Sequence, residues 1–286
     1  MPDKYKAVWV SHSSMGDFIK CPRSYYLKNM YKNPKTGKKI NIVSPALSLG
    51  SAVHEVVEGL ANYPADKRFD KPEELLVRFD TAWEKFHGKM GGFKTEQEEL
   101  DAKTRGQTMI QRVIDHPGML KEKIVKLPEG DMLPNFYLSE EDNIILCGRI
   151  DWLSYKPEDD SIHILDFKTG KNEEKEDSLQ LPIYQLLLNK LQKRKVTGAS
   201  YWYLDSEDDP KEVSLPNVEE SFDKVYKVAK QVADARETAS KEGVDKVFVC
   251  PRGEQGCFSC VPFEKILRGE AEFLGNGEWG QEMYMV

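Results

Sequence analysis

Two acidic residues and a lysine, placed close together along the chain, have the types and spacing of a metal-assisted hydrolytic site. Asp151 follows Gly148 by three positions, and Asp166 precedes Lys168 by two. Two carboxylates held about 5 Å apart repel each other unless a cation lies between them. Mg²⁺ prefers carboxylate and carbonyl oxygens, and a bound metal ion assists phosphodiester hydrolysis. The alternative interpretation is a solvated hairpin end with scattered charges, because short motifs often match by chance.

The stretch from residue 147 to residue 168 predicts two strands joined by a turn. Its flanks are rich in Ile, Leu, Trp, Tyr and Phe, and a Pro-Glu-Asp-Asp segment at 157–160 supplies turn chemistry. A turn closed by Lys156 and Ser161 puts Asp151 opposite Asp166. Without metal this like-charge contact is unrelieved, so we expect the loss of one carboxylate to cost little stability. The predicted common face carries Arg149, Asp151, Leu153, Tyr155, Ile162, Ile164, Asp166 and Lys168.

These residues resemble motifs of a known superfamily. Gly148-x-x-Asp151 followed by Asp166-x-Lys168 is similar to motifs II and III of the PD-(D/E)XK nucleases, in the RecB-like branch that includes AddB and CRISPR-associated exonucleases. Gln180-x-x-x-Tyr184 and a histidine four residues after a glycine, His54, resemble two more motifs of that branch. A lone helical histidine or an isolated Gln-x-x-x-Tyr would mean little by itself.

The resemblance implies a role for each matching residue. His54, Asp151, Asp166 and the backbone carbonyl of Phe167 would hold Mg²⁺ or Mn²⁺, and Asp151, Asp166 and Lys168 would be catalytic. Lys168 would position or activate water, and Gln180 and Tyr184 would bind the substrate strand. Glu58, one helical turn after His54, would contact the metal ligands without binding the metal ion itself.

The fold implied is α/β, with a restriction-endonuclease-like mixed sheet flanked by helices. We expect a single domain over 1–286, with a helical insertion at about 64–120 and a C-terminal cysteine loop. Residues 45–63 show the apolar spacing of one buried helical stripe. Further helices are predicted at 11–21, 72–90, 95–116 and 219–240, and after residue 177 with Pro182 in the first turn. Additional strands are predicted at 122–127, 134–139, 199–204 and 211–215, with a final hairpin at 273–279.

Four of the five cysteines are candidates for one metal-binding group. Cys250, Cys257 and Cys260 lie together in a loop that contains Gly and Pro, where thiolates can converge. The segment from Ser11 to Pro22 resembles the N-terminal signature of iron-sulfur members of the branch, which implies Cys21 as the fourth ligand. A 4Fe-4S cluster, tetrahedral zinc and free thiols all stay open, and the order of the cysteines departs from the family pattern because Cys250 precedes the pair. Cys147, in the predicted hairpin, is interpreted as a core residue.

Charge and hydropathy limit the partners. The net charge of -7 argues mildly against bulk electrostatic coating of nucleic acid. Residues 20–39, however, interleave seven Lys and Arg residues with Tyr25, Tyr26 and Tyr31, a mixture suited to phosphates and stacked bases. The alternative is a solvated basic face with inward tyrosines. No apolar run approaches the roughly 20 residues of a membrane span, so a cytoplasmic protein is expected.

The sequence therefore predicts a metal-dependent deoxyribonuclease, with exonuclease action on single-stranded DNA ends as the mode common in the resembled branch. A helicase, recombination (DNA repair) or CRISPR-associated protein is the expected partner. Two rival interpretations exist. One is a catalytically silent nucleic-acid-binding or assembly subunit with the same fold, and the other is a structural zinc protein, which leaves Asp151, Asp166 and Lys168 unexplained.

Overall fold

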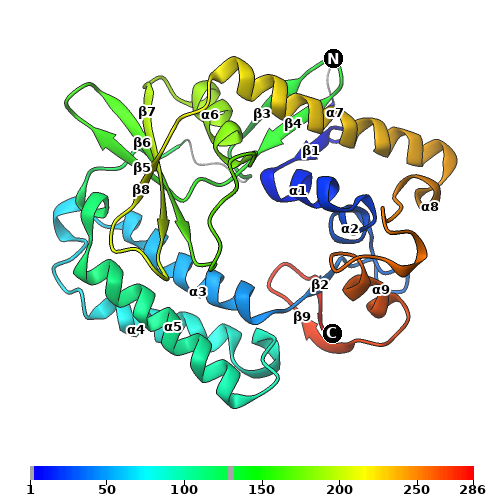
Figure 1. Cartoon of the computed structure of the whole chain (residues 1–286), viewed down its shortest axis with the longest axis horizontal. Coiled ribbons are helices and arrows are strands. Elements are labelled where there is room, and N and C mark those ends of the chain that lie inside the picture. The colour runs from blue at the N-terminus through cyan, green and yellow to red at the C-terminus, as the bar shows by residue number, and fades with distance from the viewer. Residues whose placement is uncertain (1–2, 128–131) are drawn as a thin grey trace.

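A four-stranded sheet forms the centre of the molecule. The computed structural model describes residues 3–127 and 132–286 (Figure 1). The neighbouring strands of this sheet are β5 (Trp152–Lys156), β6 (Ser161–Lys168), β7 (Val196–Tyr203) and β8 (Lys211–Val213), in that order. Strand β6 pairs antiparallel with β5 and parallel with β7, so the sheet is mixed.

The hairpin of β5 and β6 has the predicted register. Its pairs run from Lys156 with Ser161 to Trp152 with Leu165, and one further step puts Asp151 opposite Asp166. Strand β6 is buried along nearly its whole length. Burial of consecutive residues, on both faces of the strand, is typical of a strand that is covered on both sides.

Two smaller sheets accompany the central one, where the sequence predicted a single sheet. The first contains β1 (Val8–Val10), β4 (Ile144–Cys147) and β3 (Asn135–Ser139). The second contains β2 (Ile40–Ile42), β10 (Glu282–Met285) and β9 (Glu272–Asn276). Each combines a parallel with an antiparallel pair. The predicted class, α/β with mixed sheets flanked by helices, is confirmed.

Helices cover the central sheet on both faces. On one face α3 (Pro45–Gly59), α4 (Glu74–Trp83) and α5 (Glu96–Asp115) share a core with Trp152, Leu165 and Phe167. On the other face α6 (Gln180–Leu191) and α7 (Val218–Glu242) pack against Leu153, Ile162 and Ile164. Figure 1 shows α3, α4 and α5 on one side of β5–β8 and α7 on the other. Residues 64–120 thus contribute to the same core as the sheet.

The N-terminal helices and the C-terminal cysteine loop meet away from the central sheet. Figure 1 shows α2 (Pro22–Tyr25), which follows α1 (His12–Lys20), near α9 (Val261–Leu267), and Arg23 of α2 pairs with Glu264 of α9. Ser11 caps α1 in a capping box, and Cys21 separates the two N-terminal helices as the cap of α2. The remaining helices are α8 (Val244–Val247), a π-helical turn at Tyr26–Met30, and 3₁₀ turns at Leu60–Asn62, Ala65–Lys67, Glu84–Phe86, Gly88–Gly91, Gly118–Lys121 and Gly253–Gln255.

Three local predictions were wrong. Residues 122–127 make only an isolated bridge, between Ile124 and Ser154, because they touch the edge of β5 at one point. The helix predicted at 72–90 ends at Trp83 and continues as 3₁₀ turns. Cys147 ends β4 and does not belong to the hairpin. Among the described residues, no helix is both long and apolar enough to span a membrane.

Arg68 links the helical segment to the central sheet. Its buried guanidinium donates hydrogen bonds to the carbonyls of Leu60, Tyr63, Leu120 and Glu122 and lies 4.8 Å from the ring centre of Trp152. We expect Arg68→Met to lower the free energy of unfolding by about 3 kcal/mol, because the carbonyls lose charged donors. Arg78, whose guanidinium lies over Tyr63 and pairs with Glu74 near the surface, provides the control. Arg78→Met should cost less than about 1 kcal/mol in urea unfolding, and equal losses would contradict this role for Arg68.

Candidate active site

The predicted site residues converge at one end of the central hairpin. Asp166 and Lys168 end β6, while Asp151 lies just before β5. His54 comes from α3, which passes close to the chain after β6. A Cβ on residue 50 would lie 3.2 Å from the Thr169 hydroxyl oxygen. Gly50 therefore lets α3 pack closely against the chain that follows β6.

Asp166 is held by three polar side chains. Its carboxylate is 2% exposed, and Oδ1 accepts hydrogen bonds from Gln180 Nε2 at 2.8 Å and from the Tyr184 hydroxyl at 2.9 Å. Lys168 Nζ lies 2.8 Å from Oδ2, as an ion pair rather than a well-directed hydrogen bond. Gln180 and Tyr184 share one face of α6, as predicted, and bond to each other at 3.0 Å. Loss of the Asp166 carboxylate would leave buried donors without an acceptor, so the expectation of little cost was wrong for this residue.

Asp151, His54 and Glu58 form a second group. Each of the three offers one potential ligand atom, and these atoms lie within 4.8 Å of one another. His54 Nδ1 is 2.9 Å from Glu58 Oε1 and 3.6 Å from Asp151 Oδ2. Asp151 Oδ2 also accepts the Phe167 N–H at 3.0 Å, beyond the last backbone pair of the hairpin. The N–H and C=O of one strand residue point to the same side, so the Phe167 carbonyl faces the Asp151 edge.

The electrostatics of the group reflect an excess of buried negative charge. Burial, followed by the nearby carboxylate of Asp166, raises the pKa of Asp151 to about 7. Burial acts to lower the pKa of His54, but Glu58, Asp151 and Asp166 outweigh it and raise that pKa. Carboxylate and imidazole ligands suit a divalent cation, and a cation would relieve the repulsion that shifts Asp151. The donor set therefore fits Mg²⁺ or Mn²⁺.

The ammonium group of Lys168 is surrounded by acceptors. Besides Asp166, it donates to Gln180 Oε1 and lies 3.1 Å from Glu174 Oε2 and 4.8 Å from the ring centre of Tyr201. Burial acts to lower the pKa of Lys168, but Asp166 and Glu174 raise it overall. Lys168 is therefore a charged donor held in place on several sides.

Two adjoining pockets open beside the His54–Glu58–Asp151 group. Their volumes are about 460 and 530 Å³, and they share Glu55, Glu58 and Arg149 as lining residues. Arg149 is 72% exposed and pairs with Glu58 at 3.0 Å. Its partner Glu58 also contacts His54, so Arg149 lies at the edge of the His54–Glu58–Asp151 group. The Arg149 guanidinium thus brings positive charge to the mouth of an acidic site.

The structure corrects the predicted base-stacking tyrosines. Tyr184 is 5% exposed and donates to Asp166, while Tyr25 is 1% exposed and packs against Phe18 and Phe248. Neither ring is open to a base. In the basic segment, Arg23 pairs with Glu264 and Asp245, and Lys28 pairs with Asp17. These contacts support the alternative of inward tyrosines and a partly neutralised basic face.

The contacts of Glu174 and Tyr201 with Lys168 were not predicted from the sequence. Glu58 was predicted only to support the metal ligands. Glu58 bridges His54 and Arg149, and its helical spacing from His54 was the available signal. Glu174 belongs to an acidic segment before α6 that has no motif spacing. Tyr201 is brought beside Asp166 by the parallel pairing of β6 with β7, which local sequence does not specify.

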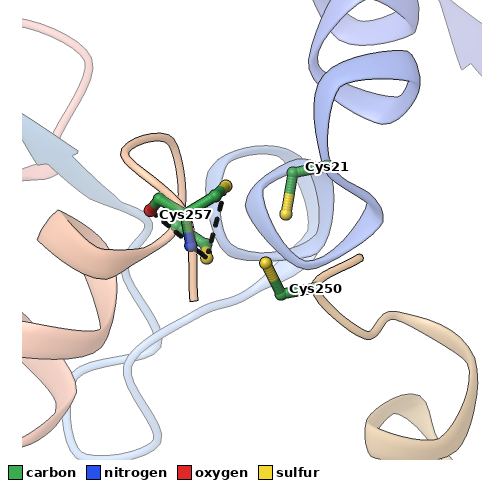
Figure 2. A group of neighbouring side chains, drawn as sticks. Cys21, Cys250 and Cys257 are labelled. Atoms are coloured by element: carbon green, nitrogen blue, oxygen red, sulfur yellow. Dashed lines mark hydrogen bonds between the residues drawn. The ribbon is translucent and has the colours of Figure 1, made fainter. Parts of the chain in front are cut away.

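Four cysteines from both ends of the chain meet in one group. The sulfur atoms of Cys21, Cys250, Cys257 and Cys260 lie within 4.8 Å of one another (Figure 2). Burial raises the pKa of Cys21 to about 12. At Cys257 burial acts upward as well, but hydrogen bonds from the backbone of Cys260 and Ser259 and from neighbouring thiols lower the pKa to about 6. The four cysteines predicted as one group thus lie together, and Cys147 lies apart, with its thiol directed to the Val10 carbonyl.

The raised pKa of Asp151 gives a pH-dependent stability. The folded state favours the neutral carboxyl, so this stabilisation is present below the unfolded pKa near 4 and is lost as the pH rises through about 7. In the presence of a chelator, Asp151→Asn should therefore raise the free energy of unfolding at pH 8 by about 1 to 3 kcal/mol, and by less at pH 5, where the folded carboxyl is still protonated but the unfolded one is already ionised.

The control for this measurement is Asp159→Asn in the exposed hairpin turn, which should have little effect at either pH. Urea unfolding at the two pH values decides the outcome. A loss of stability in Asp151→Asn at pH 8 would show that the carboxylate is not under charge repulsion.

Comparison with known proteins places the chain in a family. A search of curated proteins found no matching relative. Residues 9–262 match the family model of the PD-(D/E)XK nuclease superfamily, and this range contains all the residues described above for the carboxylate site. The match covers most of the chain, which therefore belongs to the PD-(D/E)XK nuclease superfamily.

Proposed function

We propose that this protein is a Mg²⁺- or Mn²⁺-dependent deoxyribonuclease that hydrolyses phosphodiester bonds at single-stranded DNA ends. The observation that carries the proposal is that the His54–Glu58–Asp151 group and the Asp166–Lys168 ion pair lie at the same end of the hairpin. Superfamily membership supports the hydrolytic nuclease activity. The exonuclease mode and the single-strand preference rest on the motifs that resemble the RecB-like branch, including AddB.

His54, Asp151, Asp166 and the Phe167 carbonyl would hold the metal ion. When bound, the ion supplies positive charge for the phosphate and lowers the pKa of a coordinated water. Glu58 contacts Nδ1 of His54, the ring nitrogen that lies 3.6 Å from Asp151 Oδ2, and so holds the imidazole beside that carboxylate.

Lys168 acts on the reacting phosphate and water as a donor. Its ammonium lies beside Asp166, so it can orient the attacking water or stabilise charge on the phosphate oxygens. Gln180 and Tyr184, predicted as substrate contacts, act in this proposal by holding Asp166 and Lys168 in place. Arg149, at the mouth of the site, attracts the phosphate backbone.

The four thiolates are proposed to bind a 4Fe-4S cluster, with zinc as the lesser alternative. Four thiolate ligands suit either centre. The centre would connect the N-terminal helices to the C-terminal loop. The chain is further proposed to act as one domain, with 64–120 as its helical insertion, in the cytoplasm beside a helicase, recombination or CRISPR-associated protein.

A catalytically silent DNA-binding subunit of the same fold is the competing function. Such a subunit could lose a metal ligand or the lysine without losing its role. The presence of His54, Asp151, Asp166 and Lys168 together favours the active enzyme.

The first test of the proposal separates metal binding from the chemical step. Asp166→Ala should abolish cleavage of end-labelled single strands and remove the increase in melting temperature that Mn²⁺ gives the wild type. Because Asp166 also accepts buried hydrogen bonds, this variant should unfold about 2 kcal/mol more easily without metal. Lys168→Ala should keep the Mn²⁺-induced stabilisation but lose at least about 100-fold in turnover.

Glu158→Ala in the exposed hairpin turn is the matched carboxylate control and should cut normally. Cleavage by folded Asp166→Ala at the wild-type rate would reject the nuclease site. Normal turnover by Lys168→Ala would reject its role in the chemical step.

The second test concerns the cysteines. Anaerobically purified protein should be brown, with broad visible absorption and bound iron and sulfide, because thiolate-ligated clusters have these properties. Cys21→Ala should lose the colour and most soluble protein, since it removes the tie between the chain ends. Cys147→Ala, outside the group, is the control and should stay brown. Colourless wild type with one zinc per chain would reject the iron-sulfur assignment.

A further inference from the structure

A third pocket lies beside Lys168, on the face of the sheet that carries Asp166. Its volume is about 550 Å³, and it lies between β7, β8 and the N-terminal ends of α6 and α7. The strand pairing aligns Asp166, Tyr201 and Lys211 in one row across β6, β7 and β8. Neighbouring strands are about 4.8 Å apart, so the pocket begins within one or two strand spacings of the metal ligands.

The walls of this pocket combine apolar side chains with charged ones of both signs. Leu181, Pro182, Val213, Tyr201 and Tyr203 give it apolar surface. Lys175, Lys211 and Lys224 supply positive charge, and the lining also includes Glu173, Glu174, Glu176 and Glu220. Lysines beside an apolar wall fit a ligand with an anionic part and an apolar part, provided that the neighbouring carboxylates can be displaced.

An acidic segment covers the lysines on this row. Glu174 Oε2 lies 3.1 Å from Lys168 Nζ, and Glu173 Oε1 lies 2.8 Å from Lys211 Nζ. The backbone N–H of Glu174 donates to the Tyr203 hydroxyl at 2.9 Å, which fixes the segment over the pocket. Two consecutive carboxylates thus occupy positions beside two lysines where phosphate oxygens would bind.

Three side chains with acceptor oxygens surround the ammonium of Lys168. It donates to Gln180 Oε1 and forms ion pairs with Asp166 and Glu174. Asp166 and Gln180 are fixed in β6 and α6, whereas Glu174 lies in the segment between them, outside any helix or strand. Glu174 is therefore the partner that a phosphate oxygen can displace.

We propose that this pocket is a nucleotide subsite, which holds the nucleotide next to the scissile phosphate. Its phosphate oxygens bind Lys168 and Lys211, and its sugar and base pack against the apolar wall. Glu173 and Glu174 occupy the phosphate positions until the strand displaces them. The inference rests on the proposed nuclease function and names the part of the substrate that this pocket takes.

The test measures binding of thymidine 5′-monophosphate by calorimetry with a chelator present. Glu174→Gln should bind the nucleotide about fivefold more tightly than the wild type, because the competing carboxylate is gone. Adding Lys211→Gln to Glu174→Gln should reverse most of that gain. Adding Lys227→Gln, an exposed lysine of α7 outside the pocket, is the matched control and should keep it.

Unchanged affinity in folded Glu174→Gln, or equal effects of Lys211→Gln and Lys227→Gln, would overturn the subsite. Far-ultraviolet circular dichroism establishes that each variant is folded. Because binding is measured without metal, its outcome is independent of cleavage. If the wild type cuts DNA but Glu174→Gln shows no gain in nucleotide affinity, only the subsite is overturned. If the nucleotide affinities change as expected but the wild type cuts no DNA, only the nuclease assignment is overturned.

Discussion

The buried carboxylate of Asp166 is the constraint on which the rest of the site depends. A charge that is 2% exposed at the end of a central strand must have partners, and Lys168, Gln180 and Tyr184 provide them. These contacts fix the start of α6 against β6 and hold the lysine near the hairpin end. Asp151 faces the same charge with the Phe167 N–H as its hydrogen-bond donor, and burial together with the Asp166 carboxylate raises its pKa to about 7. A divalent cation would complete the arrangement.

The cysteine group constrains the molecule at a second place. Cys21 stands between α1 and α2, while the other three members come from the last part of the chain. Helix α1 begins at His12, whose ring lies 3.4 Å from the Ser178 hydroxyl just before α6, and its last residue, Lys20, directly precedes Cys21. One short helix therefore lies between the segment that precedes α6 and the cysteine group.

The sequence predicted the parts of the site that depend on local pattern. The hairpin register follows from the turn at 157–160 and the apolar flanks, and the cysteine group follows from spacing and resemblance. The contacts of Glu174 and Tyr201 with Lys168 could not be predicted, because they depend on where a loop and a parallel strand pack. The burial of Tyr184 was missed for a similar reason, since a helical face does not reveal whether its hydroxyl meets solvent or Asp166.

The most direct test of the account is the position of the metal ion itself. Anomalous diffraction at the manganese absorption edge, from crystals grown with Mn²⁺, locates the ion without reference to activity. The account predicts one strong peak between His54, Asp151 and Asp166, about 2.0 to 2.4 Å from their ligand atoms. A peak confined to the acidic segment at 173–177, or no peak in this region while Mn²⁺ supports DNA cleavage, would contradict it.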